Sequence, residues 1–214
     1  MRENFHESLD TITDELVAMA QQVAVMLHEA SQALLTADRE RAEAVIAADE
    51  EVDTLHQELE LRTTELIALQ QPVAVDLRLI VASMRISATL ERMGDLAQHV
   101  AKAARLRHPD SAVPAPQVEQ FRAMAALADD MVAKMVRVLA TRDVHLAIEV
   151  DHEDDQMDQL HREVLEGLLR SESPVSVNEA VDATLLNRYY ERLGDHAVSV
   201  CRRVIYLVIG DREQ

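Results

Sequence analysis

Two pairs of carboxylates recur in the sequence at the same spacing, Glu91 with Asp95 and Glu191 with Asp195. Residues four apart on a helix project from the same face, so each pair would place two negative charges side by side. That arrangement is mildly destabilising unless a cation offsets it. Carboxylate oxygens are ligands for Mg²⁺, Mn²⁺, Ca²⁺ and iron, so the spacing predicts a metal site in each half of the chain.

A glycine interrupts each pair, Gly94 in the first and Gly194 in the second, although the chain has only four glycines. Glycine in the middle of a helix costs about 1 kcal/mol relative to alanine. Because glycine has no side chain, we expect a neighbouring helix to approach closely at both positions.

Two polar stripes are predicted to face these pairs from neighbouring helices. Their residues follow helical steps of four and three, beside an apolar seam rather than opposite it. The stripe residues are Asp49, Asp53 and His56 in the first half, and Asp154, Asp158 and His161 in the second. The four aspartates are predicted metal ligands, and the two histidines are additional candidates.

The alternative is a set of ordinary helix surfaces without metal, whose carboxylates are solvated or paired with arginine. Arg78, Arg85 and Arg92 recur every seven residues and therefore share a helix face, and Arg192 lies in the second motif. We interpret the repeated arginines as internal salt bridges to the acidic helix over 38–70. The alternative interpretation is that these arginines form a strip that contacts a partner protein.

The composition predicts an all-α fold. The 214 residues include 48% hydrophobic residues but only 4 glycines and 5 prolines, too few turn residues for a β-sandwich or a nucleotide-binding α/β fold. The 39 acidic residues exceed the 21 basic ones, giving a net charge of −18 that argues against nucleic-acid binding. No apolar run is long enough to span a membrane, and the N-terminus does not resemble a secretory signal. One cysteine, Cys201, is consistent with a reducing cytoplasm.

Apolar periodicity and the prolines predict six helices. The first helix ends near Thr36, and the second and third cover about 38–70 and 74–107. The fourth has an apolar seam from Phe121 to Val138, and the fifth and sixth cover about 143–170 and 175–208. Asp38 is a candidate N-cap. The segment 108–117 holds three prolines and is the predicted linker. The methionine-rich and alanine-rich seams are interpreted as core rather than as a partner groove.

The two halves are similar when shifted by 105 residues in their second helices and by 100 in their third, which aligns Gly94 with Gly194. We therefore predict two repeated antiparallel three-helix bundles related by pseudo-twofold symmetry, over 1–108 and 117–210.

The duplicated Glu-Arg-x-Gly-Asp motif resembles that of the PhoU family of phosphate-uptake regulators, and Asp76-Leu77-Arg78 and Asp195-His196-Ala197 resemble two further family elements. The resemblance implies paired three-helix bundles, usually dimeric, with multinuclear metal clusters of Mg, Mn, Fe or Zn. The implied ligands are Glu91, Asp95, Glu191 and Asp195, with Asp49, Asp53, Asp154 and Asp158 facing them. The first motif ends without a histidine after Asp95, so the two sites need not be equivalent.

The resemblance also implies a function. The family represses phosphate uptake and the phosphate-starvation response by contacting the ATPase subunit of the phosphate ABC transporter and a membrane sensor histidine kinase. We therefore expect a cytoplasmic, non-enzymatic homodimer that reaches the membrane only through its partners. The alternatives are a di-iron carboxylate oxidase of ferritin-like type and a metal-free acidic scaffold. The first normally needs Glu-x-x-His, and neither Glu91 nor Glu191 has a histidine three residues later.

Overall fold

The computed structural model describes residues 2–170 and 175–210, and every regular element in that part of the chain is helical. The elements are α1 (Arg2–Thr36), α2 (Arg39–Gln70), α3 (Ala74–Arg107), the short 3₁₀ helix η1 (Ala115–Gln117), α4 (Val118–Thr141), α5 (Val144–Leu169) and α6 (Val177–Ile209). The predicted all-α class and the six long helices are confirmed. Pro174, one of the predicted helix boundaries, lies outside the described residues.

Side chains at helix starts satisfy backbone N–H groups that have no partner within the helix. The Asp38 carboxylate accepts a hydrogen bond from Arg41 N, which confirms it as the N-cap of α2. Asp143 has the same role for α5 and accepts from the backbone of His145 and Leu146. The two caps occupy equivalent positions in the two halves, as a duplication requires.

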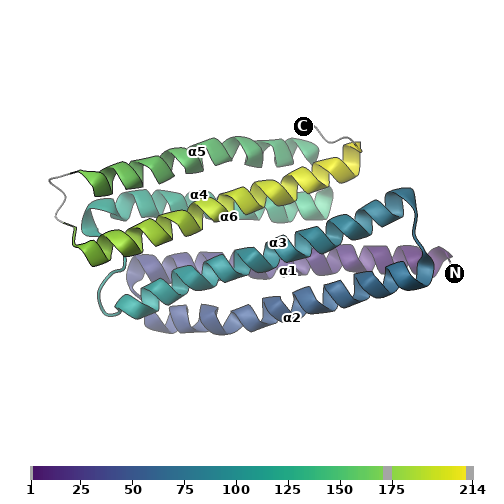
Figure 1. Ribbon diagram of the computed structural model, residues 1–214, viewed down its shortest axis with the longest axis horizontal. Helices are drawn as coiled ribbons and strands as arrows, with labels where there is room; N and C mark the ends of the chain where they lie inside the picture. Colours follow the sequence, from purple (N-terminus) through teal and green to yellow (C-terminus); the bar gives the residue numbers. More distant parts are fainter. Residues whose placement is uncertain (1, 171–174, 211–214) are drawn as a thin grey trace.

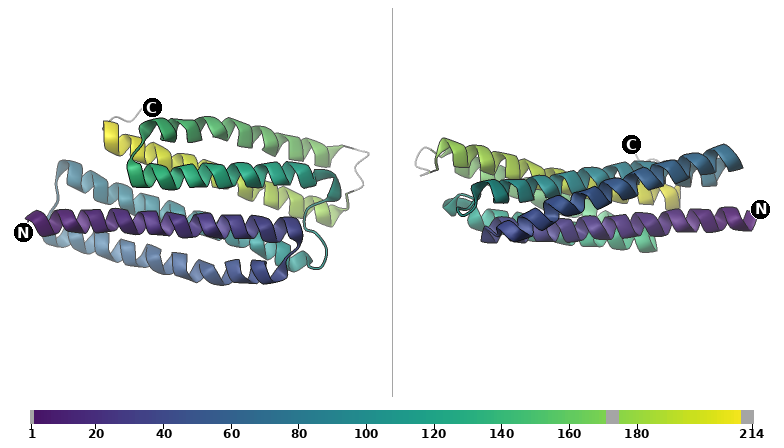
Figure 2. Two further views of the ribbon diagram at one scale, coloured as in Figure 1. Left: turned by 180° about the vertical axis from the view of Figure 1, so that it is seen from behind. Right: turned by 90° about the horizontal axis from the view of Figure 1, so that it is seen from below.

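The six helices form two three-helix bundles that lie side by side (Figure 1). Helices α1, α2 and α3 pack together, as do α4, α5 and α6. The bundles join where α3 packs on α6 and α1 packs on α4, on opposite faces of the molecule (Figure 2). The C-terminal ends of α2 and α5 lie at opposite ends of the molecule, consistent with the predicted pseudo-twofold relation (Figure 1).

The apolar seams are buried over most of their length, although Leu69, which the predicted seam of α2 includes, is exposed. Seam methionines such as Met19, Met93, Met131 and Met135 have no exposed surface, and one continuous core runs through both bundles. Tyr190 is fully buried, and its hydroxyl shares a 2.9 Å hydrogen bond with Ser31 Oγ from the other bundle. The core thus fixes the two repeats against each other as well as the helices within each.

Candidate functional site

The first acidic cluster lies between α2 and α3, where Asp49 and Asp53 face Glu91 and Asp95. Burial raises the pKa of Asp49, and the charges of Asp53 and Asp95 raise it further. The pKa of Glu91 is also raised, mainly by burial and in part by Asp95 and Asp53, although Arg92 opposes the shift. The buried Asp49 and the half-buried Glu91 and Asp95 therefore lie near one another between two helices, with the exposed Asp53 beside them.

The second cluster repeats this arrangement between α5 and α6 with Asp154, Asp158, Glu191 and Asp195. Burial, followed by the charges of Asp195 and Asp158, raises the pKa of Asp154 to about 6. The pKa of Glu191 is raised by burial and then by Asp195, and to a smaller extent by Asp158. In both clusters the neighbouring carboxylates raise one another's pKa, and a bound cation would relieve their repulsion.

Close helix packing at the two glycines is what brings each cluster together. A Cβ atom at Gly94 would lie 3.3 Å from Asp49 Oδ1 and 3.2 Å from Val52 Cγ1. A Cβ atom at Gly194 would lie 3.2 Å from Asp154 Oδ1. The predicted close approach is thus confirmed at both positions, and it explains why each motif tolerates a helix-weakening residue.

The two histidines differ in their surroundings. His56 Nδ1 shares a 2.8 Å hydrogen bond with Ser87 Oγ. His161 Nδ1 is buried without a hydrogen-bond partner, as is Glu191 Oε2 beside it. An unpaired buried donor or acceptor costs about 1–3 kcal/mol, so the second cluster has two atoms that a metal ion would satisfy. The first cluster has a ready partner for its histidine, and the two sites are therefore not equivalent.

The ion pairs of the arginines on α3 differ in part from those that the sequence predicted. Arg92 contacts Asp95 at 2.9 Å and Glu91 at 3.5 Å on its own helix. Arg85 is in no ion pair within the described residues, and the Arg78 guanidinium lies over the Tyr206 ring. The predicted salt bridges from these arginines to α2 are wrong, because this face of α3 meets α6 instead.

The sequence did not predict two residues that lie beside the clusters. Arg188 forms an ion pair with Glu191. Its spacing of three residues before Glu191 is the signal that could have identified it. Ser87, the partner of His56, carries no signal in the sequence, because only the packing of α2 on α3 places it there.

The donor set fits a hard cation such as Mg²⁺, Mn²⁺ or iron, and the histidines extend the range to Zn²⁺. In the described part of the chain, no three acidic, histidine or cysteine side chains converge tightly enough to form a closed ligand cage. The fit rests on the raised carboxylate pKa values and on the unpaired atoms of Glu191 and His161. Metal ligation at these residues stays a prediction.

Replacing His161 by alanine is expected to weaken Mn²⁺ binding at the second cluster by about tenfold. Its unpaired ring nitrogen is the reason. His56→Ala is the matched control and should change binding at the first cluster much less, because Ser87 already satisfies that ring. Titration of the metal-free protein with Mn²⁺ would measure both effects. Equal losses in the two variants would contradict the inferred asymmetry.

Cys201 is buried and its thiol has a pKa raised to about 12, chiefly by burial, so it is a poor nucleophile.

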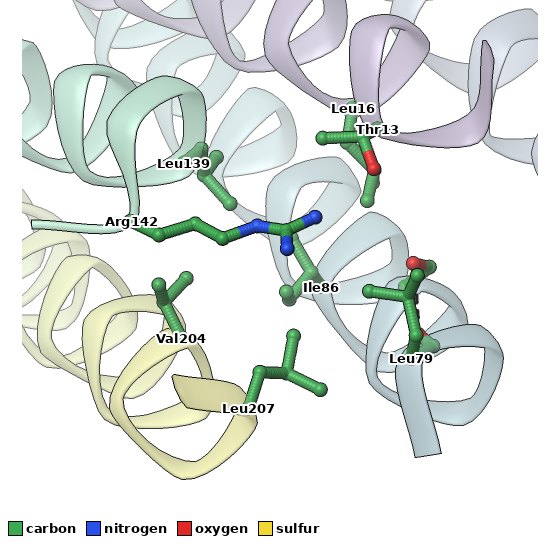
Figure 3. A pocket seen from close by; sticks show the side chains of 9 residues that line it. Thr13, Leu16, Leu79, Ile86, Leu139, Arg142, Val204 and Leu207 are labelled. Atoms are coloured by element: carbon green, nitrogen blue, oxygen red, sulfur yellow. Dashed lines mark hydrogen bonds between the residues drawn. The ribbon is translucent and has the colours of Figure 1, made fainter. Parts of the chain in front are cut away.

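A mainly apolar cavity lies where α1, α3, α4 and α6 meet, and the Arg142 side chain extends across it (Figure 3). Its lining contains none of the predicted ligands. None of the helices in the described ranges is long and apolar enough to cross a membrane.

The structure therefore belongs to the class of duplicated three-helix bundles with one carboxylate cluster in each repeat. The family model described as "PhoU domain" matches this chain twice, over residues 16–104 and 121–204. The chain belongs to the PhoU family.

Relatives match over nearly the full chain. "Phosphate-specific transport system accessory protein PhoU homolog 2" of Mycobacterium tuberculosis is 42% identical over 210 residues, covering 98% of this chain and 99% of the relative. "Phosphate-specific transport system accessory protein PhoU homolog" of Clostridium acetobutylicum is 32% identical over 216 residues, covering 98% of this chain and 96% of the relative. The crystal structure of PhoU from Pseudomonas aeruginosa has a TM-score of 0.88 and 28% identity, covering 97% of this chain and all of that one.

Proposed function

We propose that this chain is a metal-binding accessory regulator of phosphate-specific transport, which lowers phosphate uptake and the phosphate-starvation response. The observation that carries the proposal is the family match in both repeats, supported by relatives over nearly the full length that are named as accessory proteins of this transport system. The raised pKa values of Asp49 and Asp154 support a cation site in each repeat, and a bound cation would stabilise one conformation.

Each repeat would hold its metal with carboxylates from two neighbouring helices. Glu91 and Asp95 would bind from α3, with Asp49 and Asp53 facing them. Glu191, Asp195, Asp154 and Asp158 would do so in the second repeat. A bound divalent ion would neutralise the mutual repulsion within each cluster, and it would thereby tie α2 to α3 and α5 to α6.

The partners we propose are the ATPase subunit of the phosphate ABC transporter and a membrane sensor histidine kinase, contacted at the cytoplasmic face by a homodimer. The name "accessory protein", given to the relatives, supports association with the transporter. Contact with the kinase and the dimeric state follow from the family resemblance.

A regulatory role without catalysis agrees with the residues around the clusters. A ferritin-like di-iron site would need a histidine three residues after each glutamate, where this chain has Gly94 and Gly194. Both glycines are in tight contact with the facing helix, which leaves no space there for a histidine ring. Oxygen consumption by iron-loaded protein would reveal the enzymatic alternative.

Deleting the gene is expected to leave phosphate-responsive transcription on in high phosphate. Any second PhoU-family gene should be deleted as well, so that it cannot compensate. Reporter activity and phosphate uptake would be measured, with the wild-type gene reintroduced as the control. Full repression in the deletion strain would reject the regulatory function.

Complementation with a variant of both motifs tests the contribution of metal separately. The variant E91Q/D95N/E191Q/D195N keeps the shape of each cluster and lowers its charge. We expect it to accumulate normally but to restore repression poorly. Full repression by this variant would favour the metal-free scaffold.

A further inference from the structure

Asn187 is a further polar residue beside the second cluster, and it has no exposed surface. It lies on α6 one helical turn before Glu191, so the two side chains leave the same face of the helix. That face packs on α5, since the Asn187 side chain bonds to the backbone of His161 and the charge of His161 acts on Glu191. A buried side-chain amide needs partners for both its nitrogen and its oxygen.

In the described part of the chain, only the nitrogen of this amide has a hydrogen-bond partner. Asn187 Nδ2 donates a hydrogen bond of 3.1 Å to the backbone oxygen of His161. Because a carbonyl oxygen accepts hydrogen bonds and does not donate them, this contact fixes the amide with its nitrogen towards His161 O. Asn187 Oδ1 is buried on the other side of the amide, and within residues 2–170 and 175–210 nothing donates to it.

Three unpaired buried atoms therefore belong to adjoining turns of α5 and α6. They are Asn187 Oδ1, Glu191 Oε2 and His161 Nδ1, which are three of the eight such atoms in the described residues. Buried polar atoms normally have a partner, so this concentration at one place needs a physical reason. With the ring proton on Nε2, all three atoms are electron-pair donors. They cannot satisfy one another, but a single cation can accept from all of them.

The first repeat has a different residue, Ser87, at the position equivalent to Asn187. The two residues are equally buried, at 1% and 0% exposure. Ser87 Oγ shares a 2.8 Å hydrogen bond with Nδ1 of His56, the histidine equivalent to His161. This bond satisfies the first histidine without a ligand. The duplication thus supplies an internal comparison, in which the same position closes the first site and leaves the second open.

We propose that Asn187 Oδ1 is a ligand of the cation at the second cluster, together with His161 Nδ1 and Glu191 Oε2. This inference rests on the metal binding proposed above and extends it to the choice of metal. Two oxygens and an imidazole nitrogen suit Mn²⁺, Fe²⁺ or Zn²⁺, whereas Mg²⁺ prefers oxygen ligands alone. At the first cluster Ser87 holds the histidine, so only carboxylates would bind and Mg²⁺ would be accepted. The two repeats are therefore expected to differ in metal selectivity.

The test exchanges Asn187 for the residue of the first repeat. Asn187→Ser removes the amide oxygen and offers His161 the hydroxyl partner that His56 already has. It is expected to weaken Mn²⁺ binding at the second cluster by at least about tenfold, and to reduce the preference for Mn²⁺ over Mg²⁺ there. Calorimetric titrations would use the chelator-treated full chain carrying Glu91→Gln and Asp95→Asn, so that the first cluster contributes little.

Asn178→Ser is the matched control, because Asn178 lies on the same helix and is exposed. Asn187→Asp is a second variant, which keeps the shape of the side chain and replaces the amide oxygen by a carboxylate oxygen. It should bind Mn²⁺ at least as tightly as the parent protein, although it loses the hydrogen bond to His161 O, and it tests the ligand independently of Asn187→Ser. Thermal unfolding in chelator shows that each variant is folded.

Equal Mn²⁺ affinities of the parent protein, Asn187→Ser and Asn178→Ser would overturn the inference and leave the proposed metal binding intact. So would equal losses of affinity in Asn187→Ser and Asn187→Asp, because the hydrogen bond to His161 O would then matter rather than the oxygen ligand. Absence of Mn²⁺ binding by the wild-type protein would overturn the inference together with the metal binding on which it rests.

Discussion

Replacing Asp154 by asparagine is expected to stabilise the metal-free protein and, at the same time, to abolish the part of its stabilisation by metal that comes from the second cluster. The pKa of this carboxyl rises from 3.8 to about 6 on folding, mainly because it is buried and secondarily because it faces Asp195 and Asp158. At pH 7 that difference corresponds to about 3 kcal/mol of unfavourable free energy, and partial solvent exposure reduces it to about 2 kcal/mol. Removing the charge should raise the melting temperature by about 4–8 °C.

The stability of the metal-free protein should depend on pH because of the same shift in the pKa of Asp154. Because the folded protein holds the Asp154 proton more tightly than the unfolded chain, lowering the pH through about 6 relieves the penalty. Metal-free wild type should therefore gain about 1 kcal/mol from this group between pH 7 and pH 5. The raised pKa values of Asp49, Glu91 and Glu191 act in the same direction. Asp154→Asn should show a smaller gain.

Thermal unfolding with chelator, and with added Mn²⁺ or Mg²⁺, measures both halves of this prediction. Metal should stabilise the wild type, since ligand binding to the folded state raises its stability. Asp151→Asn is a control on the same helix, because Asp151 contacts Arg202 at 2.6 Å at the surface, and it should keep the response to metal. If Asp154→Asn is destabilised in chelator, or responds to metal as the wild type does, the cluster is not a cation site.

The helices could be predicted because their signals are local. Prolines mark the linker and the α2–α3 turn, an aspartate begins α2, and the apolar period defines each buried face. The duplication then predicted which elements repeat, and Gly94 and Gly194 identified where helices approach within a repeat. Those inferences depend only on spacing along one helix and on its nearest neighbour in the chain.

The arginine row could not be assigned in this way. Its spacing of seven shows that Arg78, Arg85 and Arg92 share a face of α3, but spacing does not say which helix that face meets. Helix α3 packs on α1 and α2 within its repeat and on α6 of the other. The contact with α6 is a property of how two similar bundles associate, and no periodicity in either bundle encodes it.

A second large change in stability is expected from a substitution in the core that the two repeats share. Phe121 of α4 is fully buried, and its ring lies 6.4 Å from that of Tyr190, whose hydroxyl bonds to Ser31 of the first repeat. Phe121→Ala should lower the free energy of unfolding by about 3–5 kcal/mol, because it removes the buried ring and leaves a cavity that rigid helices fill poorly. The melting temperature should fall by about 8–15 °C.

Tyr190→Phe separates packing from hydrogen bonding at the same place. It keeps the ring contact with Phe121 and removes the bond to Ser31, so a loss of about 1 kcal/mol is expected. Because one core runs through both bundles, the Phe121→Ala protein should unfold in a single lowered transition rather than losing the second repeat first. Calorimetry would distinguish these outcomes. Two resolved transitions would show that the repeats are independently stable and that the shared core couples them only weakly.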